Sequence, residues 1–402
     1  MIIVQKYGGT SLADFERMEN VARRIIAAKE AGNRVVVVLS AQGKHTDELV
    51  ALAEAANPRG SKRERDLLLA TGEQVSVTLM ALVLQRLGHG AISLNARQAG
   101  IFSTSDFGAA RIKKIETERI LAELEMGNIV IITGFQGEAR HGELTTLGRG
   151  GSDTTAVALA AALKAHACEI YTDVEGVYSA DPRLVANAKK LPEISYDEML
   201  ELAALGAQVL QKRSVGLAKK YGVRLAVRSA MSDAAGTIVK EGNGVEGNFV
   251  SGVVNHDGIV RITISGVKDA PGVWYKVFDI MNDGDIAIDF VQQKKRSDGT
   301  KDISFTLDAE RLDDAKAILA GNTHRLNFTG LAHDDHIAKL SVVSTGMATN
   351  PGVPSLMFEA LFDAGINIDS ISTSEIRVSV LIDKKEAARA AAIVHAKFFN
   401  GR

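Results

Sequence analysis

The first 240 residues of the chain alternate between short runs of apolar, mostly β-branched residues and longer segments in which apolar residues recur at helical spacing. The short runs predict strands and the longer segments predict helices. The predicted strands are residues 2–5, 34–39, 91–94, 128–133, 169–172 and 223–227, and the predicted helices are residues 14–31, 71–87, 111–126, 153–165 and 207–221. This alternation indicates an α/β fold in which a mainly parallel sheet is sandwiched between helices.

Polar clusters follow four of the predicted strands. They are residues 6–11, 40–47, 134–137 and 173–183. Ligands of parallel α/β sheets bind at the carboxyl ends of the strands. We therefore expect these clusters to meet at one edge of the sheet and to form a binding site there.

The pattern changes after residues 236–248, a segment rich in glycine, asparagine and glutamate that we interpret as a linker. Beyond it, Ser265–Gly272 is echoed by Thr345–Gly352 and Ile286–Asp289 by Ile366–Asp369, each 80 residues later and without a gap (265 to 345, 286 to 366). Such a repeat predicts two copies of a βαββαβ module. In each copy a Pro-Gly turn opens a helix (273–282 and 353–364), and a strand runs through the I-x-I-D signature.

Charge and cysteine content narrow the class of protein. The chain has 47 basic and 49 acidic residues and a net charge of −2, so electrostatics favours neither nucleic acid nor an anionic membrane as a partner. The single cysteine, Cys168, lies in an apolar strand and is expected to be a buried hydrophobic residue. We found no signal-peptide pattern and no uncharged apolar run of ~18 residues. These features predict a soluble, unprocessed cytoplasmic protein that binds small molecules.

The segment Thr145–Thr154 is the most informative part of the sequence, because it combines three glycines with Arg149, Ser152 and Asp153 immediately before an apolar helix. Glycines allow a ligand to approach the backbone, a helix N-terminus presents free N–H groups, and arginine binds carboxylate or phosphate with two donors. The alternative is a turn that only reverses the chain. The composition favours an anion-binding loop.

The segment Lys6–Ser11 places a lysine and two glycines at the end of the first strand. Lys6 can neutralise a phosphate whose oxygens approach the backbone of Gly8 and Gly9; a Gly-Gly turn beside an unrelated lysine is the alternative. The sequence contains no G-x-x-x-x-G-K-[ST] loop. Asp106-Phe-Gly108 matches a protein-kinase triplet, but the other protein-kinase motifs are missing, so we interpret it as coincidence.

Three further segments have both a structural and a functional interpretation. Glu73 follows Thr71 and Gly72 at a predicted helix start, where it is either a favourable first-turn charge or a ligand for the ammonium group of an amino acid. The loop at residues 173–183 is either a surface turn or a nucleotide-binding segment. The group His333–His336 resembles a metal site by composition but lacks regular ligand spacing, so no metal is expected there.

Taken together, these segments resemble the aspartate kinase family. The resemblance rests on Lys6–Ser11, Gly134–Gly137, Thr146–Asp153, Tyr171–Asp173 with Gly176–Arg183, and the two I-x-I-D repeats, and it covers nearly the whole chain. It implies an amino-acid-kinase fold followed by two ferredoxin-like ACT modules. It also implies that ATP, with Mg²⁺ bridging its phosphates, phosphorylates the side-chain carboxylate of L-aspartate in the pathway to lysine, threonine and methionine.

The resemblance also implies roles for individual residues. The implied catalytic residues are Lys6, which holds the transferring phosphoryl group, and Asp153, which orients Lys6. The implied substrate-binding residues are Ser40, Thr46, Glu73, Arg149, Gly150, Gly151 and Ser152, with Arg149 on a carboxylate and Glu73 on the α-amino group. The implied ATP-binding residues are Lys6, Tyr7, Gly8, Gly9, Thr10, Thr172, Asp173, Tyr178, Asp181, Arg183 and Gln208. The implied effector-binding residues are Asp269, Gly272, Gln293, Val353, Pro354, Asn367, Ile368, Ser374 and Glu375.

The sequence departs from the family pattern at three positions. Gln208 stands where the family usually has a lysine that contacts the nucleotide. In the first repeat, Ala287 replaces the asparagine kept as Asn367 in the second, and Trp274 stands where a small residue would leave room for an effector. We therefore expect the second module, with Asn350 in its Pro-Gly segment, to be the more complete effector site.

The expected domains are the kinase domain (1–240), a linker (241–250), a first ACT module (251–330) and a second one (331–402), with strands exchangeable between the modules. A homo-oligomer, or an assembly with an ACT-only regulatory subunit, is expected, and lysine is the favoured inhibitor over threonine. The sequence does not decide whether an internal start, such as one at the codon of Val245, produces such a subunit. Two other functions remain open. One is a related kinase for glutamate, and the other is a non-catalytic amino-acid sensor.

Overall fold

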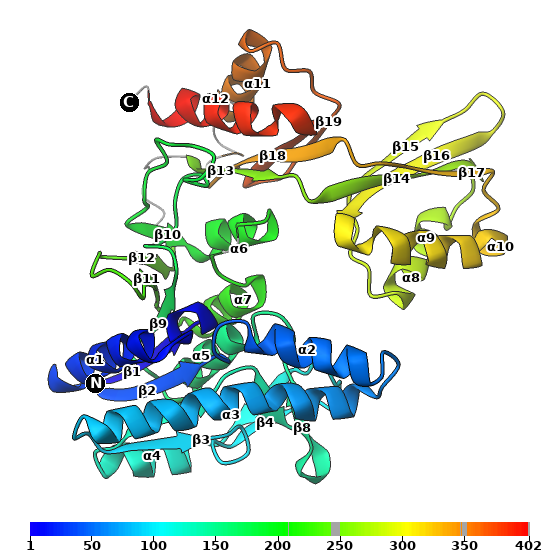
Figure 1. Cartoon of the computed structure of the whole chain (residues 1–402). Helices are drawn as coiled ribbons and strands as arrows, with labels where there is room; N and C mark the ends of the chain where they lie inside the picture. The colour runs from blue at the N-terminus through cyan, green and yellow to red at the C-terminus, as the bar shows by residue number, and fades with distance from the viewer. Residues whose placement is uncertain (208, 243–249, 346, 348–351, 401–402) are drawn as a thin grey trace. The chain divides into compact units, whose positions relative to one another are not determined.

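The computed structural model describes residues 1–207, 209–242, 250–345, 347 and 352–400 (Figure 1). The chain forms two compact units. The first consists of Met1–Tyr178 and Lys190–Val245, and the second of Ser179–Lys189 and Glu246–Arg402. Each unit has its own hydrophobic core. The first corresponds to the predicted α/β part and the second to the predicted repeat.

The first unit is built on an eight-stranded sheet with the order β10-β12-β11-β9-β1-β2-β6-β3. Its strands are β1 (Ile2–Tyr7), β2 (Arg34–Leu39), β3 (Ala91–Leu94), β6 (Ile129–Thr133), β9 (Ala167–Thr172), β10 (Glu193–Ser195), β11 (Leu225–Ser229) and β12 (Thr237–Lys240). Neighbouring strands are parallel except β11 and β12. A smaller sheet contains β4 (Ile101–Ser103), β5 (Ile112–Ile115), β7 (Gln136–Glu138) and β8 (Leu144–Thr146).

Helices cover both faces of the large sheet. They are α1 (Phe15–Glu30), α2 (His45–Ala56), α3 (Lys62–Arg86), α4 (Glu118–Glu125), α5 (Gly151–Ala162), α6 (Tyr196–Ala204) and α7 (Lys212–Tyr221). Helices α1 and α3 pack on the face that carries Ile3, Val35 and Ile129. Lys6 projects from the opposite face because side chains alternate along a strand, and its contact with Asp153 places α5 there. The predicted mainly parallel sheet between helices is confirmed.

Several predicted elements of the first unit are wrong in extent. Residues 111–117 do not begin a helix, because Ile112–Ile115 pairs with β4 as strand β5 and only Glu118–Glu125 is helical. Helix α3 begins at Lys62 rather than at residue 71, with Ser61 accepting a hydrogen bond from the Glu64 N–H (3.3 Å). Glu73 is therefore not a first-turn charge, which removes the structural interpretation of that residue.

Helix α3 is long and apolar enough to cross a membrane, and half of the residues in its most apolar window are buried inside the fold. It packs beside α1 and under the sheet, where Met80 and Leu84 are fully buried. The helix also places Asp66 and Glu73 in the interior, where they hydrogen-bond to neighbouring segments. It is a core helix of the first unit.

The second unit contains two four-stranded sheets, each covered by helices. The first sheet, β15-β16-β14-β17, is formed by β14 (Ile259–Lys268), β15 (Asp289–Lys295), β16 (Thr300–Asp308) and β17 (Gly330–Asp334) with α8 (Val273–Asp283), α9 (Leu312–Gly321) and α10 (Thr323–Leu326). The second, β13-β18-β20-β19, is formed by β13 (Val250–His256), β18 (Ile337–Ser344), β19 (Ser370–Thr373) and β20 (Arg377–Asp383) with α11 (Gly352–Asp363) and α12 (Ala387–Phe399). Strand β13 precedes the first module in sequence but belongs to the second sheet.

The I-x-I-D signatures lie at the start of a strand rather than within it. Strand β15 begins at Asp289, and β19 begins at Ser370, one residue after Asp369. The two aspartates tie the modules together. Asp289 accepts a hydrogen bond from the nearly buried Lys339 of β18 (2.8 Å), and Asp369 is ion-paired with Arg261 of β14 (2.5 Å). Each signature thus bonds to the central strand of the other module.

The segment Ser179–Lys189 leaves the first unit and packs into the core of the second module, where Ala180 and Val185 are buried. Ser179 is fully buried. Its hydroxyl forms a hydrogen bond with His395 of α12 (2.8 Å) and accepts one from the Lys189 N–H (2.8 Å), while its carbonyl accepts from the Val253 N–H (2.8 Å). The predicted boundary at residue 240 does not include this excursion of the chain.

Candidate active site

The centre of the site is a largely buried ion pair between Lys6 and Asp153. Lys6 lies near the carboxyl end of β1 and Asp153 in the first turn of α5, with 2.6 Å between Nζ and Oδ1. Both side chains are only about one-tenth exposed (12% and 10%). A cation held this way in a region of low dielectric constant attracts an anion more strongly than a solvated lysine would.

The glycines beside this pair allow segments of backbone to approach closely. Gly9 follows β1, and a Cβ there would lie 2.5 Å from the carbonyl oxygen of Ala41. Gly150 precedes α5 with φ 68°, and a Cβ there would lie 1.9 Å from the Gln211 side chain. Both positions require glycine because a Cβ would clash, and Gly150 also requires it because of its positive φ. The turns hold the first segment next to residues 41–43 and the second at the N-terminus of α5.

Two hydroxyl groups connect the segment after β2 with α5. The Ser40 hydroxyl donates a hydrogen bond to the Ser152 hydroxyl (3.0 Å). Thr46 lies in the first turn of α2, and Ser152 lies in the first turn of α5. The N-termini of two helices therefore carry predicted substrate residues, and free N–H groups at such ends favour a carboxylate.

Glu73 is 2% exposed and lies in the interior of α3. Its Oε1 accepts a hydrogen bond from the Ala41 N–H (3.1 Å), whereas its buried Oε2 has no hydrogen-bond partner among the described residues. Burial raises the pKa of Glu73 to about 7, although the Ala41 N–H and the Gln136 side chain offset part of this effect. A buried carboxylate with an unused oxygen is costly by itself, and a bound cation would relieve that cost.

The predicted nucleotide residues are distributed over several segments. Thr172 and Asp173 follow β9 and are joined by a hydrogen bond (2.9 Å), and Tyr178 is half-buried. Asp181 and Arg183 belong to the second unit, where Arg183 is exposed and lowers the pKa of the Asp181 carboxyl through hydrogen bonds. Gln208 lies outside the described residues.

The side chain of Tyr7 cannot contact a nucleotide at this site, which corrects the prediction for that residue. Tyr7 is fully buried on the face of the sheet opposite to Lys6, and its ring stacks on that of Tyr171 with 4.6 Å between centroids. Burial is also the main cause that raises the Tyr7 pKa well above its usual value. The alternation of side chains along β1 explains this result, since neighbours in a strand point to opposite faces.

Sequence analysis missed three residues around the site. Asp66 of α3 is 1% exposed and accepts hydrogen bonds from Thr146 and from the Gly108 N–H. Arg213 of α7 donates to the carbonyl oxygens of Leu147 and Ala110, both at 2.8 Å. Gln136 is fully buried and donates to the carbonyl oxygen of Ala70 (2.7 Å). Of the three, only Gln136 lies in a segment that the sequence singled out, the cluster 134–137, whereas Asp66 follows the charged run Lys62–Arg65 outside the helix predicted from residue 71.

Comparison with known proteins agrees with this geometry. The model of the amino acid kinase family matches residues 1–229, and an ACT domain model matches residues 340–398. The aspartokinase of Bacillus sp. (strain MGA3) is 48% identical over 398 residues, which cover 99% of this chain and 97% of the relative. The chain belongs to the aspartokinases. The fold class and the family predicted from the sequence are thereby confirmed, and so is the prediction that the chain is an enzyme.

Two solved structures of another aspartokinase resemble the chain over 99% of its length. E. coli aspartokinase III in complex with aspartate and ADP (R-state) gives a TM-score of 0.84 at 25% identity and is covered completely (100%). The same enzyme in complex with lysine and aspartate (T-state) gives a TM-score of 0.80 at 26% identity and is covered to 99%. These two structures thus share the folds of both units of the chain.

The predicted effector residues of this aspartokinase differ between its two modules. In the first, the Trp274 indole donates a hydrogen bond to Gln293 (3.1 Å), and Asp269 is ion-paired with Lys295 and Lys301. Gly272 caps α8 with φ 84°. In the second, Val353 is buried, Pro354 and Ile368 are half-buried, and Asn367, Ser374 and Glu375 are exposed. The polar side chains Asp269 and Gln293 of the first module are thus engaged by neighbouring side chains, whereas the polar side chains Asn367, Ser374 and Glu375 of the second are exposed. Asn350 lies outside the described residues.

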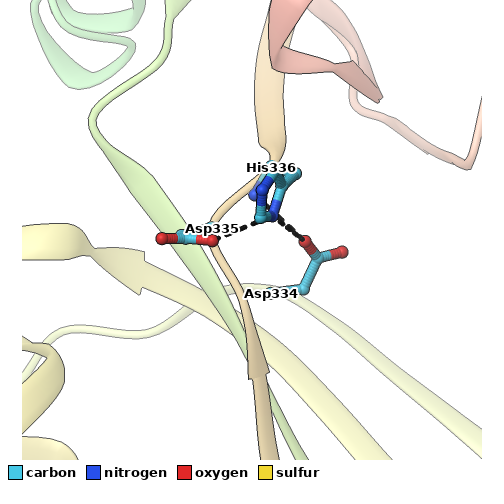
Figure 2. A group of neighbouring side chains, drawn as sticks. All are labelled: Asp334, Asp335 and His336. Atoms are coloured by element: carbon cyan, nitrogen blue, oxygen red, sulfur yellow. Dashed lines mark hydrogen bonds and ion pairs between the residues drawn. The ribbon is translucent and has the colours of Figure 1, made fainter.

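The group at His333–His336 forms a capped turn between β17 and β18. Figure 2 shows the His336 ring between the carboxylates of Asp334 and Asp335, with Nδ1 at 3.7 and 2.9 Å from their oxygens. Asp334 also accepts a hydrogen bond from the His336 N–H (3.0 Å) and one from Arg261 (2.7 Å). The ring and Arg261 therefore already engage these carboxylates, which are the potential metal ligands of the group.

A cavity of about 480 Å³ opens over β1, β9 and β11 beside α1. Its walls include Arg24, which is ion-paired with Asp233 (2.9 Å), and Arg228, which is ion-paired with Glu169 (3.5 Å). It contains none of the predicted substrate or nucleotide residues. The cavity lies on the sheet face opposite to Lys6 and is separate from the candidate active site.

Proposed function

We propose that this enzyme transfers the γ-phosphoryl group of ATP to the β-carboxylate of L-aspartate and forms 4-phospho-L-aspartate. The observation that carries the proposal is the buried Lys6–Asp153 pair at the end of β1, because it sets a fixed cation beside two glycine turns and a helix N-terminus. Phosphoryl transfer depends mainly on positioning and on neutralising the charge of the transferring group. The similar E. coli aspartokinase III has been solved in complex with aspartate and ADP, which supports this pair of substrates.

No general base is required for this reaction. The attacking group is a carboxylate with an ordinary pKa of about 3.9, so it is already ionised near neutral pH. One carboxylate oxygen of aspartate forms a bond to the γ-phosphorus while the bond from that phosphorus to the bridging oxygen of ADP breaks. Lys6 stabilises the negative charge on the transferring oxygens, and Asp153 keeps the Lys6 ammonium in place.

The remaining substrate residues orient aspartate. Glu73, with its unused buried oxygen, is proposed to accept the α-ammonium group. Arg149 is proposed to bind the α-carboxylate, and Ser40 and Thr46 to complete the pocket with the N–H groups of Gly150 and Gly151. An enzyme specific for glutamate would need the groups that bind the substrate one methylene further from the phosphoryl group. Because buried hydrogen bonds fix the positions of these groups, the pocket is expected to discriminate between aspartate and glutamate.

The nucleotide is proposed to bind along the segments after β1 and β9, with Gly8, Gly9 and Thr10 at the phosphates and Thr172, Asp173 and Tyr178 nearby. Gln208 is proposed to complete the site, and the roles of Asp181 and Arg183, which belong to the second unit, stay predictions from the resemblance. Mg²⁺ in such sites is held by phosphate oxygens and one or two carboxylates. Asp173 is exposed and fits this role better than Asp153, whose carboxylate is engaged by Lys6.

The deciding experiment is ATP-dependent acyl-phosphate formation from aspartate, trapped as the hydroxamate. Turnover with aspartate and not with glutamate is the expected result. Turnover with glutamate alone would show that the enzyme acts on a different acid. No turnover with either acid, despite tight binding of an amino acid, would identify the chain as a sensor.

Arg149→Ala raises the KM for aspartate by roughly 10- to 100-fold and changes kcat and the KM for ATP by less than about threefold. A hydrogen bond to a charged group contributes about 1.5–3 kcal/mol, which corresponds to this range. Steady-state kinetics with each substrate varied separately measure the split. An unchanged KM for aspartate in the folded variant would place the α-carboxylate elsewhere.

We also propose that an end-product amino acid, lysine in the first place, inhibits the enzyme by binding to the second regulatory module. E. coli aspartokinase III has been solved with lysine, and the second module here leaves Asn367, Ser374 and Glu375 exposed. In the first module, Trp274 engages Gln293 and leaves less room. Such regulation fits the first step of lysine, threonine and methionine synthesis in the cytoplasm. Paired modules make a homo-oligomer, or an assembly with an ACT-only subunit, the proposed quaternary state.

Asn367→Ala abolishes inhibition by lysine or threonine and leaves activity without effector within about twofold of wild type. The reason is that the exposed amide can bond both the carboxylate and the ammonium group of an amino acid. Inhibition curves for lysine, threonine and their mixture measure the effect. Full inhibition of the variant would exclude this position as an effector ligand.

A further inference from the structure

Three segments in or beside the proposed aspartate pocket are hydrogen-bonded to one helix, α3. The segment after β2 donates from the Ala41 N–H to Glu73, and the segment after β6 donates from Gln136 to the Ala70 carbonyl oxygen. The strand before the Arg149 loop donates from Thr146 to Asp66. Asp66 and Glu73 are seven residues apart and therefore lie on the same side of the helix, two turns from each other.

The contact through Asp66 is the strongest of the three. Its Oδ2 accepts from the Thr146 N–H (2.7 Å) and from the Gly108 N–H (2.9 Å), and its Oδ1 accepts from the Thr146 hydroxyl (2.9 Å). Asp66 is 1% exposed and Thr146 is also 1% exposed. All three donors are neutral, so the buried charge is balanced by directed dipoles, which makes each hydrogen bond stronger and geometrically stricter.

Arg213 holds the same loop from the other side. Its two Nη atoms donate to the carbonyl oxygens of Leu147 and Ala110, both at 2.8 Å. The Ala110 N–H in turn donates to the Thr146 carbonyl oxygen (2.9 Å). Residues 146 and 147, the last before the Gly148–Gly151 turn, are thus fixed by one buried carboxylate and one guanidinium that do not bond each other. The Asp106–Ala110 segment is held in the same network.

We propose that Asp66 and Arg213 are positioning residues that fix the Arg149 loop for the α-carboxylate of the substrate, an inference that rests on the proposed function. They do not touch substrate themselves. Two charged side chains direct their hydrogen bonds to residues 146 and 147, directly before the Arg149 turn, and to the adjoining segment 108–110. A substrate-binding group works well only when its supporting contacts hold it in the productive geometry. The network fixes the position of the Arg149 turn relative to Glu73. Glu73 is part of α3, and the segment before the turn is hydrogen-bonded to Asp66 of the same helix.

The test uses the full chain with Asp66→Asn, Arg213→Lys and the double variant. Asparagine keeps the shape of the side chain but loses the charge and replaces one of the two acceptor oxygens by an amide donor. Lysine keeps the positive charge of Arg213 but has no guanidinium to donate two hydrogen bonds at once. Each single variant is expected to weaken aspartate binding about three- to tenfold by calorimetry without nucleotide, with kcat and the Kd of ADP within about twofold of wild type. The loss of aspartate affinity in the double variant is expected to be smaller than the product of the two single losses, because both residues hold the same loop.

Glu123→Gln is the matched control. Glu123 is another buried carboxylate of the first unit, 5% exposed and bonded to Arg119 and Asn128, and its loss should leave the Kd of aspartate unchanged. Aspartate affinity within twofold of wild type in both folded single variants overturns the proposal. An equal loss of ADP affinity, or an equal effect of Glu123→Gln, also overturns it, because the role would then be general stability.

Hydrogen exchange separates failure of this inference from failure of the proposed function. Asp66→Asn should speed amide exchange in residues 146–151 relative to wild type without any ligand, since the anchored N–H of Thr146 loses its charged acceptor. If wild type does not bind aspartate, the proposed function fails while this readout still tests the anchoring. Amide exchange of residues 146–151 at wild-type rates in both single variants would show that Asp66 and Arg213 do not anchor this loop.

Discussion

Replacing Lys6 by alanine lowers kcat for aspartate phosphorylation by at least about 10²-fold, the loss found when one preorganised charge stabiliser is removed. The fold holds the Lys6 ammonium group near the carboxyl end of β1, 2.6 Å from Asp153 and with only 12% of the side chain exposed. Its loss removes charge stabilisation and leaves the Asp153 carboxylate to repel the phosphates. Single-turnover measurements with saturating ATP and aspartate report the effect on the chemical step.

Two further variants sharpen this prediction. Lys6→Arg keeps the charge but places a planar fork where a point charge is needed, so an intermediate loss is expected. Lys240→Ala removes another strand lysine of the first unit that is paired with a carboxylate, Glu193 (2.6 Å), and should leave kcat unchanged. A folded Lys6→Ala variant with kcat within threefold of wild type would place phosphoryl transfer elsewhere.

Replacing Glu73 by glutamine has two opposite effects, a large loss of aspartate binding and a gain in stability. Glutamine cannot balance the α-ammonium charge, so the KM for aspartate rises by roughly 10- to 100-fold. The free enzyme becomes more stable at pH 8, because burial raises the pKa of Glu73 to about 7 and ionisation there opposes folding. At about 1.4 kcal/mol for each pKa unit, the gain reaches about 3 kcal/mol.

The sign of the pH dependence follows from the raised pKa. The folded state binds the Glu73 proton more tightly than the unfolded chain, so the cost of ionising Glu73 is fully present above pH 7 and is lost as the pH falls toward about 4.5. The stability difference between Glu73→Gln and wild type should therefore shrink between pH 8 and pH 5. Urea unfolding at these two pH values measures it, with Glu123→Gln as the control. A difference that stays constant with pH would show that Glu73 does not titrate in this range.

In wild type, the same protonation should weaken aspartate binding. Below about pH 7 the Glu73 carboxyl is increasingly neutral in the free enzyme, so a cationic substrate group must first displace its proton. Stability and substrate affinity therefore depend on pH in opposite directions. This is the expected signature of a buried charge that is kept for binding rather than for folding.

Strands and glycine turns were predicted well where a local pattern forces them. Strands 34–39 and 91–94 have the predicted limits, and the continuous apolar run of residues 35–39 is typical of a buried parallel strand. The Gly148–Gly151 turn was predicted from its glycines, and the structure gives a reason for one of them, because Gly150 combines a positive φ with a close approach to Gln211. Such local constraints are written in the composition of a few neighbouring residues.

Element limits failed where a distant partner decides between two local possibilities. Ile112–Ile115 has apolar spacing compatible with a helix, but pairing with β4 makes it a strand. Gly72 suggested the start of a helix, yet α3 continues through it. The reason for a glycine at this position is space, since a Cβ there would lie 2.9 Å from the Ala41 side chain. The glycine serves close packing of the helix rather than its termination.

The sequence by itself determined the family, the sheet, the repeat and most side chains of the candidate site, because residue type, spacing and order specify strand ends and glycine turns. Only the tertiary structure decided which groups become buried and bonded. It turned Tyr7 away from Lys6, assigned Ser179–Lys189 to the second unit and brought Asp66 and Arg213 to the Arg149 loop. These outcomes depend on contacts between residues far apart in the chain, and the local pattern of residues does not determine such contacts.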